Sequence, residues 1–249
     1  MADSSDADIQ VWMRRGSALF EGVFVVLAAL VAASLAVAVI REPLVAATGG
    51  TPDATIVQLS VTVIQFVFFG LVVFWYLRVT DRWKMVGFDE FEPTHAIAIA
   101  VGTAVLLGGQ LGISALFSSL GISTGANRAI TDGLGNPEYF FGMIIISLLL
   151  VGPAEELLFR GVLQARLRES WGAWPAIVLA TIVFGAIHLP AIIGEPTQQY
   201  ATLVVIALLG LVLGYLYERT RTIWVPAIVH GANNAVIFAI QYAGAIGLL

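Results

Sequence analysis

Two adjacent glutamates and an arginine interrupt a strongly apolar stretch of the chain, residues 142–167. Charged groups are costly at membrane depth and therefore usually mark a functional site. Glu156 and Arg160 are four residues apart, the spacing at which an acid and a following base meet on one face of a helix. Glu155 has no base at that spacing, so we expect it to be the free carboxylate. Such a group can take a proton from water, which is the work of a general base.

Two of the three histidines lie in apolar segments further along the chain. Glu155 lies 16 residues before Trp171 and His188 lies 17 residues after it, so two antiparallel helices joined near Trp171 would bring both side chains to about the same depth. His230 and Asn234 are four residues apart and share a helix face. An imidazole N–H and an amide that point the same way are suitable donors for an oxyanion.

The chain that must position these residues has the composition of a polytopic membrane protein. Of its 249 residues, 59% are hydrophobic and 12% are charged, whereas about one quarter of a soluble domain is charged. The absence of cysteine excludes disulfides, thiolate metal sites and a cysteine nucleophile. Because the basic residues are scattered, no nucleic-acid partner is expected. The expected surroundings are a lipid bilayer, and the expected location is the cell membrane, which the chain crosses several times.

Apolar stretches of about 20 residues predict an all-α bundle with about seven transmembrane helices. They are Ser17–Ile40, Thr55–Leu77, His95–Leu120, Tyr139–Leu167, Ala173–Ile193, Tyr200–Tyr217 and Ile223–Ala245. Residues 1–13 are expected to form a short, acidic, disordered tail, and residues 14–249 a single transmembrane domain.

The basic residues predict the orientation. Nine of them fall on one side of the predicted spans and two on the other, which indicates a cytoplasmic N-terminus by the positive-inside rule. His230 lies nearer the cytoplasmic end of its helix, so we expect the site to open toward the cytoplasmic leaflet.

Other polar residues in the predicted spans have simpler expected roles. Gln58 and Gln65 share a face of the second helix, and Gln110 lies in the third; interhelical hydrogen bonds are the expected role for all three. Asn233 is rotated away from Asn234 by about 100° and could support the site indirectly. His95 begins the third helix and is expected at the membrane interface.

Three motifs in order carry a resemblance to a known family. They are Glu155-Glu156-x-x-x-Arg160, Phe184-x-x-x-His188 and His230-x-x-x-Asn234, on three predicted membrane helices. Together they resemble the motifs of the CAAX prenyl protease 2 family, also called the CPBP or Abi family, which is similar to the Ras-converting CAAX endopeptidase. The resemblance covers residues 139–245, and the first three helices match only as generic membrane helices.

The resemblance implies an intramembrane endopeptidase in which a glutamate and a histidine activate water. By motif position, Glu155 would be the general base and His188 would help to hold the water. His230 and Asn234 would stabilise the oxyanion. The expected substrate is a membrane-associated protein cut near its C-terminus, of which prenylated CAAX proteins are the best-known type.

The remaining motif positions, Glu156, Arg160 and Phe184, would support and shape this site.

Three alternatives stay open from the sequence. A zinc-dependent version would use Glu155, Glu156, His188 and His230 as ligands, although no H-E-x-x-H motif is present. The expected mechanism needs no metal or other cofactor. A non-catalytic membrane scaffold or bacteriocin-immunity type protein is the second alternative. A proton-coupled transporter is the third, although the chain lacks an internal repeat.

Overall fold

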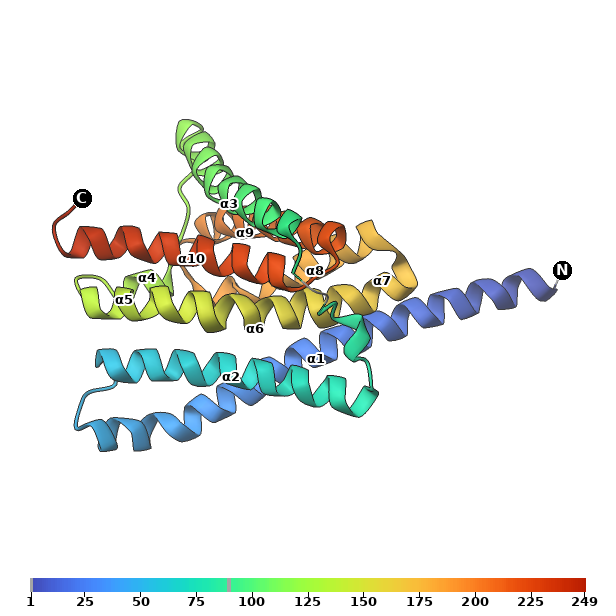
Figure 1. The fold of residues 1–249 in the computed structure, drawn as a ribbon, viewed down its shortest axis with the longest axis horizontal. Helices are drawn as coiled ribbons and strands as arrows, with labels where there is room; N and C mark the ends of the chain where they lie inside the picture. The colour runs from blue at the N-terminus through green and yellow to red at the C-terminus, as the bar shows by residue number, and fades with distance from the viewer. Residues whose placement is uncertain (1, 89–90) are drawn as a thin grey trace.

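The computed structural model describes residues 2–88 and 91–249 and shows an all-α bundle, as predicted (Figure 1). Its α-helices are α1 (Ala2–Thr48), α2 (Thr55–Thr80), α3 (Pro93–Ser119), α4 (Arg128–Thr131), α5 (Pro137–Ile146), α6 (Gly152–Glu156), α7 (Ala165–Trp171), α8 (Ala173–Ile187), α9 (Pro196–Thr220) and α10 (Trp224–Ala245). Two π-helical segments, η2 (Ser147–Val151) and η3 (Leu157–Gln164), join α5, α6 and α7 into one long helix.

Short elements complete the described chain. These are the 3₁₀ turns η1 (Trp83–Met85) and η4 (Leu189–Ala191) and the strands β1 (Ala126–Asn127) and β2 (Ile192–Ile193). The two strands pair antiparallel, with Ala126 opposite Ile193. The first strand follows α3 and the second follows η4, so this pairing joins two distant loops.

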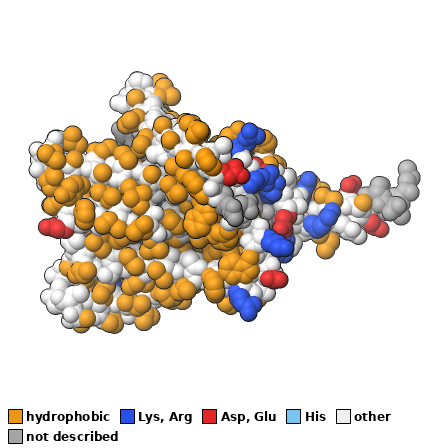
Figure 2. Space-filling model, viewed as in Figure 1, with side chains coloured by type: hydrophobic (Ala, Val, Ile, Leu, Met, Phe, Trp, Pro, Cys, Tyr) orange, Lys and Arg blue, Asp and Glu red, His pale blue; other side chains and the backbone are white. Residues whose placement is uncertain are grey.

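Among residues 2–88 and 91–249, six helices are long and apolar enough to cross a membrane. They are Asp6–Thr48, Thr55–Thr80, Pro93–Ser119, Pro137–Trp171, Ala173–Ala191 and Pro196–Thr220. The predicted seventh span is present as a helix, α10, but it is not among these six. It carries His230, Asn233 and Asn234, which lower its hydropathy. Figure 2 shows hydrophobic side chains over the body of the bundle and charged ones gathered toward the N-terminal end.

The expected disordered tail is helical in the structure. Helix α1 begins at Ala2 and projects beyond the bundle (Figure 1), so the prediction for residues 2–13 was wrong. The ring of Trp12 packs edge-on against Trp171 at 6.1 Å. The guanidinium of Arg15 lies 5.1 Å from the centres of both rings. These contacts hold the part of α1 around Trp12 and Arg15 against Trp171. The sequence had indicated only an acidic composition for residues 1–13.

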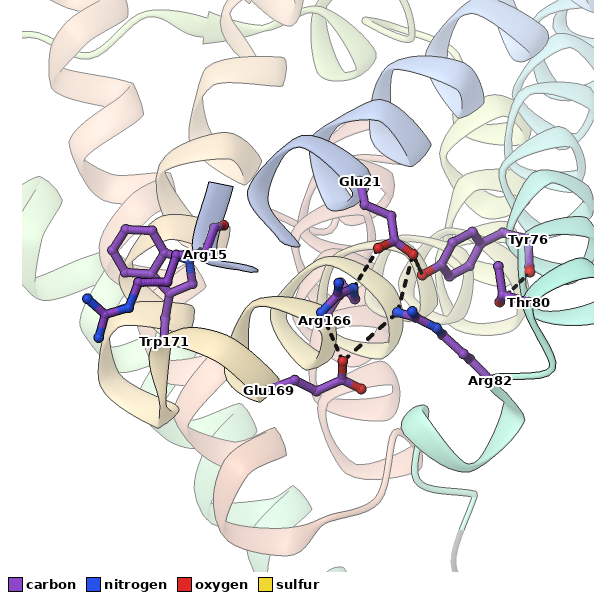
Figure 3. A network of polar contacts seen from close by, with 8 residues as sticks. All are labelled: Arg15, Glu21, Tyr76, Thr80, Arg82, Arg166, Glu169 and Trp171. Atoms are coloured by element: carbon purple, nitrogen blue, oxygen red, sulfur yellow. Dashed lines mark hydrogen bonds and ion pairs between the residues drawn. The ribbon is translucent and has the colours of Figure 1, made fainter. Parts of the chain in front are cut away.

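A network of charges ties three helices together at the N-terminal end of the bundle (Figure 3). The carboxylate of Glu21 in α1 accepts from Tyr76 of α2 at 2.7 Å and from Arg166 of α7 at 2.7 Å. Arg82 lies 3.2 Å from Glu21 and 3.9 Å from Glu169. Because α7 continues from the helix that holds the two motif glutamates, the network fixes that helix against α1 and α2.

Candidate active site

Two glycines let α10 cross closely over the helix that carries the glutamates. A Cβ built on Gly152 would lie 2.7 Å from the carbonyl oxygen of Ala227 and from the backbone nitrogen of Gly231. A Cβ on Gly231 would lie 2.9 Å from the carbonyl oxygen of Ser147. Small residues permit such backbone contact between membrane helices. The crossing brings His230 next to Glu155 and Glu156.

The backbone around the glutamates is locally widened. Helix α6 is only five residues long and lies between the π-helical segments η2 and η3. Pro153 has no N–H to donate to the preceding turn, which favours such a break in the α-helical pattern. Single π-turns inside helices are frequent at functional sites. Glu155 and Glu156 are nevertheless buried, with 6% and 0% of their surface exposed.

One oxygen of Glu156 binds two cationic or potentially cationic side chains. Its Oε1 accepts from NH1 of Arg160 at 3.0 Å, the pair predicted from the spacing. It also lies 2.8 Å from Nδ1 of His230, a contact that the sequence did not predict. Arg160 donates through NH2 to the carbonyl oxygen of Gly210 in α9 at 2.9 Å. Glu156 therefore joins α6, η3 and α10, and Arg160 extends the connection to α9.

The geometry fixes how His230 carries its proton. A carboxylate only accepts hydrogen bonds, so Nδ1 of His230 donates to Glu156. The other nitrogen, Nε2, lies 3.6 Å from Oε2 of Glu155. In the neutral ring Nε2 is an acceptor, and it becomes a donor only when the ring is doubly protonated. The expected oxyanion role of His230 therefore requires the imidazolium form.

Glu155 differs from its neighbour as the spacing predicted. Within the described chain it accepts no hydrogen bond from a protein group, and the 3.6 Å approach of His230 is its nearest ionic contact. Asn234 is similar, because the only side-chain hydrogen bond that it makes with a described residue is the one its Oδ1 accepts from Asn233 at 3.5 Å. Its amide N–H₂ group has no acceptor among residues 2–88 and 91–249 and is available as a donor.

Phe184 and His188 form the third side of the site. Nδ1 of His188 donates to the carbonyl oxygen of Phe184 at 2.6 Å, which leaves Nε2 as the unprotonated nitrogen of the neutral ring. The ring of Phe184 lies 4.6 Å from that of His188 and 5.9 Å from that of His230. Its face also lies 4.6 Å from the guanidinium carbon of Arg160. Phe184 thus contacts a residue from each of the three motifs.

The motif residues line one cavity of about 1130 Å³. Its lining includes Glu155, Phe184, His188, His230 and Asn234, and it also includes Asn233. No hydrogen bond links His188 to Glu155 in the described structure, so the cavity is what they share. The three helices α6, α8 and α10, with the turn after α8, therefore present their polar groups to a common space.

The cavity continues toward the end of the bundle opposite α7. Its lining there includes Arg41, Asp53, Asn127 and Arg128, which are exposed and lie near the α1–α2 connection and α4 (Figure 1). None of its described lining residues comes from α7. The cavity therefore continues away from the arginine-rich end, where α7 lies, and the expected opening toward the cytoplasmic leaflet stays a prediction. The position of His230 along its helix predicted how deep in the membrane it lies. Where the cavity opens depends on how the loops and helices pack.

Polar residues that were expected to join helices line this cavity, and among them only Gln58 makes a hydrogen bond to another element in the described structure. Gln65 of α2 and Gln110 of α3 make no hydrogen bond with any described residue and belong to the cavity wall. Gln58 donates to the carbonyl oxygen of Asp132 at 3.5 Å. Ser147 is fully buried in the wall, and its hydroxyl has no partner among the described residues. In the sequence, the only indication that these residues line a cavity was that they are polar and lie within apolar spans.

Two further predicted positions can be placed. His95 is buried and accepts, through Nδ1, a hydrogen bond from the backbone N–H of Glu92, so it caps α3. Among residues 2–88 and 91–249, no three histidine or acidic side chains form a group that could hold a metal ion. In particular, one oxygen of Glu156 is already occupied by Arg160 and His230.

The part of the chain that carries these motifs is similar to known proteins. Residues 137–236 match the family described as type II CAAX prenyl endopeptidase Rce1-like. The resemblance indicated by the three motifs is therefore confirmed for this region. No solved structure matches.

Two curated relatives from Bacillus subtilis (strain 168) match the chain. "Putative membrane peptidase YdiL" is 30% identical over 100 residues, which make up 40% of this chain and 37% of that protein. "Uncharacterized protein YpbD" is 34% identical over 98 residues, or 39% of this chain and 44% of that protein. The matched part is thus less than half the length of either relative. With its apolar helices, the chain is a multi-pass membrane protein.

Proposed function

We propose that the chain is an intramembrane endopeptidase that cuts a peptide bond near the C-terminus of membrane-associated proteins. One observation carries the proposal: Glu155, His188, His230 and Asn234, from three helices, line one cavity, and Glu155 is left without a hydrogen-bond donor in the described structure. The similarity to a family of CAAX endopeptidases and to a relative named as a membrane peptidase supports it.

The proposed reaction uses Glu155 as the general base. Glu155 takes one proton from a water molecule, and the water oxygen bonds to the carbonyl carbon of the peptide. The unprotonated Nε2 of His188 accepts a hydrogen bond from the same water and so holds it in place. The C–N bond then breaks, and the proton on Glu155 passes to the leaving nitrogen. No metal ion or other cofactor takes part in this scheme.

The negative charge that develops on the carbonyl oxygen needs donors. Asn234 supplies an amide N–H that has no acceptor within the described chain, and His230 supplies Nε2–H when its ring is an imidazolium. Glu156 accepts from Nδ1 and stabilises the charged ring. In this scheme Glu156 and Arg160 position His230, and Phe184 holds both histidine rings.

The protein, purified in detergent, tests the proposal with two fluorogenic peptides, one ending in a farnesylated CAAX box and one with the same sequence unmodified. We expect cleavage that Glu155→Gln and His188→Ala abolish. The matched control is Glu42→Gln, because Glu42 is exposed and lies outside the cavity lining. Cleavage of the farnesylated peptide alone would identify a prenyl requirement.

The same assay separates the alternatives. Activity that a chelator removes and added zinc restores would replace the glutamate mechanism by the zinc-dependent one. Full activity in Glu155→Gln would disprove the general-base role. If wild-type protein cuts neither peptide nor a mixed peptide library, the non-catalytic scaffold becomes the better reading.

A further inference from the structure

Polar side chains of α2 form a strip along the part of the cavity that this helix lines. Gln58, Thr62 and Gln65 lie on one face of α2, at the i, i+4 and i+7 positions, and all three line the cavity. Gln110 of α3 and Asn233 of α10 also line the cavity. Primary amides therefore reach this space from three helices.

These amides have unused hydrogen-bonding groups. Gln65 and Gln110 make no hydrogen bond to any residue in the described ranges, and the side-chain oxygen of Asn233 is buried without a partner. Unpaired amides are unfavourable within a membrane protein, where hydrogen-bond partners are scarce. The strip therefore favours a polar occupant in this part of the cavity.

The chemistry of the strip matches a peptide main chain. Each primary amide offers two N–H donors and one carbonyl acceptor, the same groups that a peptide bond offers in complementary form. A lipid chain would leave the amides of Gln65 and Gln110 unpaired. An anion would use the donors and leave the carbonyl oxygens unpaired. A peptide main chain, which repeats a donor and an acceptor at each residue, can satisfy both kinds of group along the strip.

The dimensions agree with an extended chain. Gln58 and Gln65 are seven residues apart, which on a helix corresponds to about 10 Å. That distance equals about three residues of an extended strand at about 3.3 Å each. Gln58 lies near the cavity end that contains Asp53 and Asn127, and Gln65 lies deeper, in the direction of Glu155.

We propose that Gln58, Gln65, Gln110 and Asn233 bind the main chain of a substrate peptide in extended conformation, irrespective of its side chains. The peptide enters at the end of the bundle that contains α4 and leads to Glu155. This inference rests on the proposed peptidase function and adds the way in which the enzyme holds its substrate.

The test compares Gln65→Leu and Gln110→Leu with wild type on the unmodified or farnesylated peptide that wild type cuts. Leucine keeps the volume and removes the amide. We expect KM to rise about tenfold, which one lost hydrogen bond of about 1.4 kcal/mol explains, while kcat changes less than about twofold. The matched control is Gln241→Leu, because Gln241 is also half-buried but does not line the cavity.

A second measurement varies the backbone of the peptide. Peptides N-methylated at single positions lose one backbone donor each, and we expect one to three of them to bind more weakly to Glu155→Gln, as measured by fluorescence anisotropy. In Gln65→Leu on the same background, at least one of these losses should disappear. Unchanged KM in both variants, or equal binding of all methylated peptides, would overturn the inference. If wild type cuts no peptide, the proposed peptidase function itself is contradicted. If wild type cuts a peptide but the variants behave like wild type, only the proposed main-chain binding is contradicted.

Discussion

Nδ1 of His230 donates to Oε1 of Glu156 at 2.8 Å, across 74 residues of sequence. This contact joins the last motif to the first and gives Glu156 two tasks. It neutralises Arg160, and it sets which nitrogen of His230 faces Glu155. In serine hydrolases a buried carboxylate also accepts a hydrogen bond from a histidine and fixes its tautomer. The two arrangements share this physical principle and not a common fold.

Replacing Glu156 by glutamine should lower peptide turnover by at least about a hundredfold, because loss of the carboxylate behind a catalytic imidazole is severe. The glutamine oxygen can still accept from His230, so binding of the peptide should change little. Initial rates over a range of substrate concentrations give kcat and KM separately. A kcat within about threefold of wild type, with the protein folded, would show that Glu156 does not position His230.

Replacing Arg160 by methionine should destabilise the fold by about 3 kcal/mol, because it leaves a buried carboxylate without its cation. The double variant Glu156→Gln/Arg160→Met should recover part of that loss, since no unpaired charge remains. Thermal unfolding in detergent measures both. If the double variant is less stable than the single one, the buried charge is not the source of the cost.

Replacing Gly231 by alanine should destabilise the bundle by about 1–3 kcal/mol, because the added methyl group meets the backbone of Ser147 and that backbone cannot rotate away. Gly244→Ala is the matched control, on the same helix, with no atom within 4 Å of the added Cβ. We expect the control to unfold at or slightly above the wild-type temperature. Equal unfolding temperatures for the two variants would argue against the close crossing.

The natural absence of cysteine makes the orientation directly measurable. Asp53→Cys lies at the cavity end and Arg168→Cys at the arginine-rich end. If the positive-inside rule holds, a membrane-impermeant maleimide added to intact cells should label position 53 and not position 168. Permeabilised cells provide the control for access. The opposite labelling would place the N-terminus outside and the cavity end in the cytoplasm.

The sequence predicted the contacts that depend on local spacing. Glu156 and Arg160 lie on one helix, so their pairing follows from helical geometry alone. The contact of Glu156 with His230 depends on the close crossing at Gly152 and Gly231, which no local pattern determines. The all-α class followed from long apolar runs. The count of seven spans is not confirmed, because the polar residues of α10 lower its hydropathy.

The direction of the cavity and the role of the glutamines were also beyond the sequence. Gln65 and Gln110 are polar residues in apolar helices, and a hydrogen bond to a neighbouring helix is their usual role. Whether these two side chains bond to a neighbouring helix or line a cavity depends on the distance between the packed helices, which the sequence does not give. Likewise, Trp12 lies before the predicted first helix. It contacts Trp171 and Arg15, and these contacts depend on the folded structure.

Helix α10 supplies His230 and Asn234, and every other element that lines the site precedes it in the chain. During synthesis, Glu155 and His188 therefore precede their partners on α10, which is translated last. Until α10 inserts and crosses at Gly152, Glu156 has Arg160 as its partner in the described structure but lacks His230, and Asn234 is also absent from the site. Under the proposed function, each chain therefore completes its peptidase site only when α10 inserts.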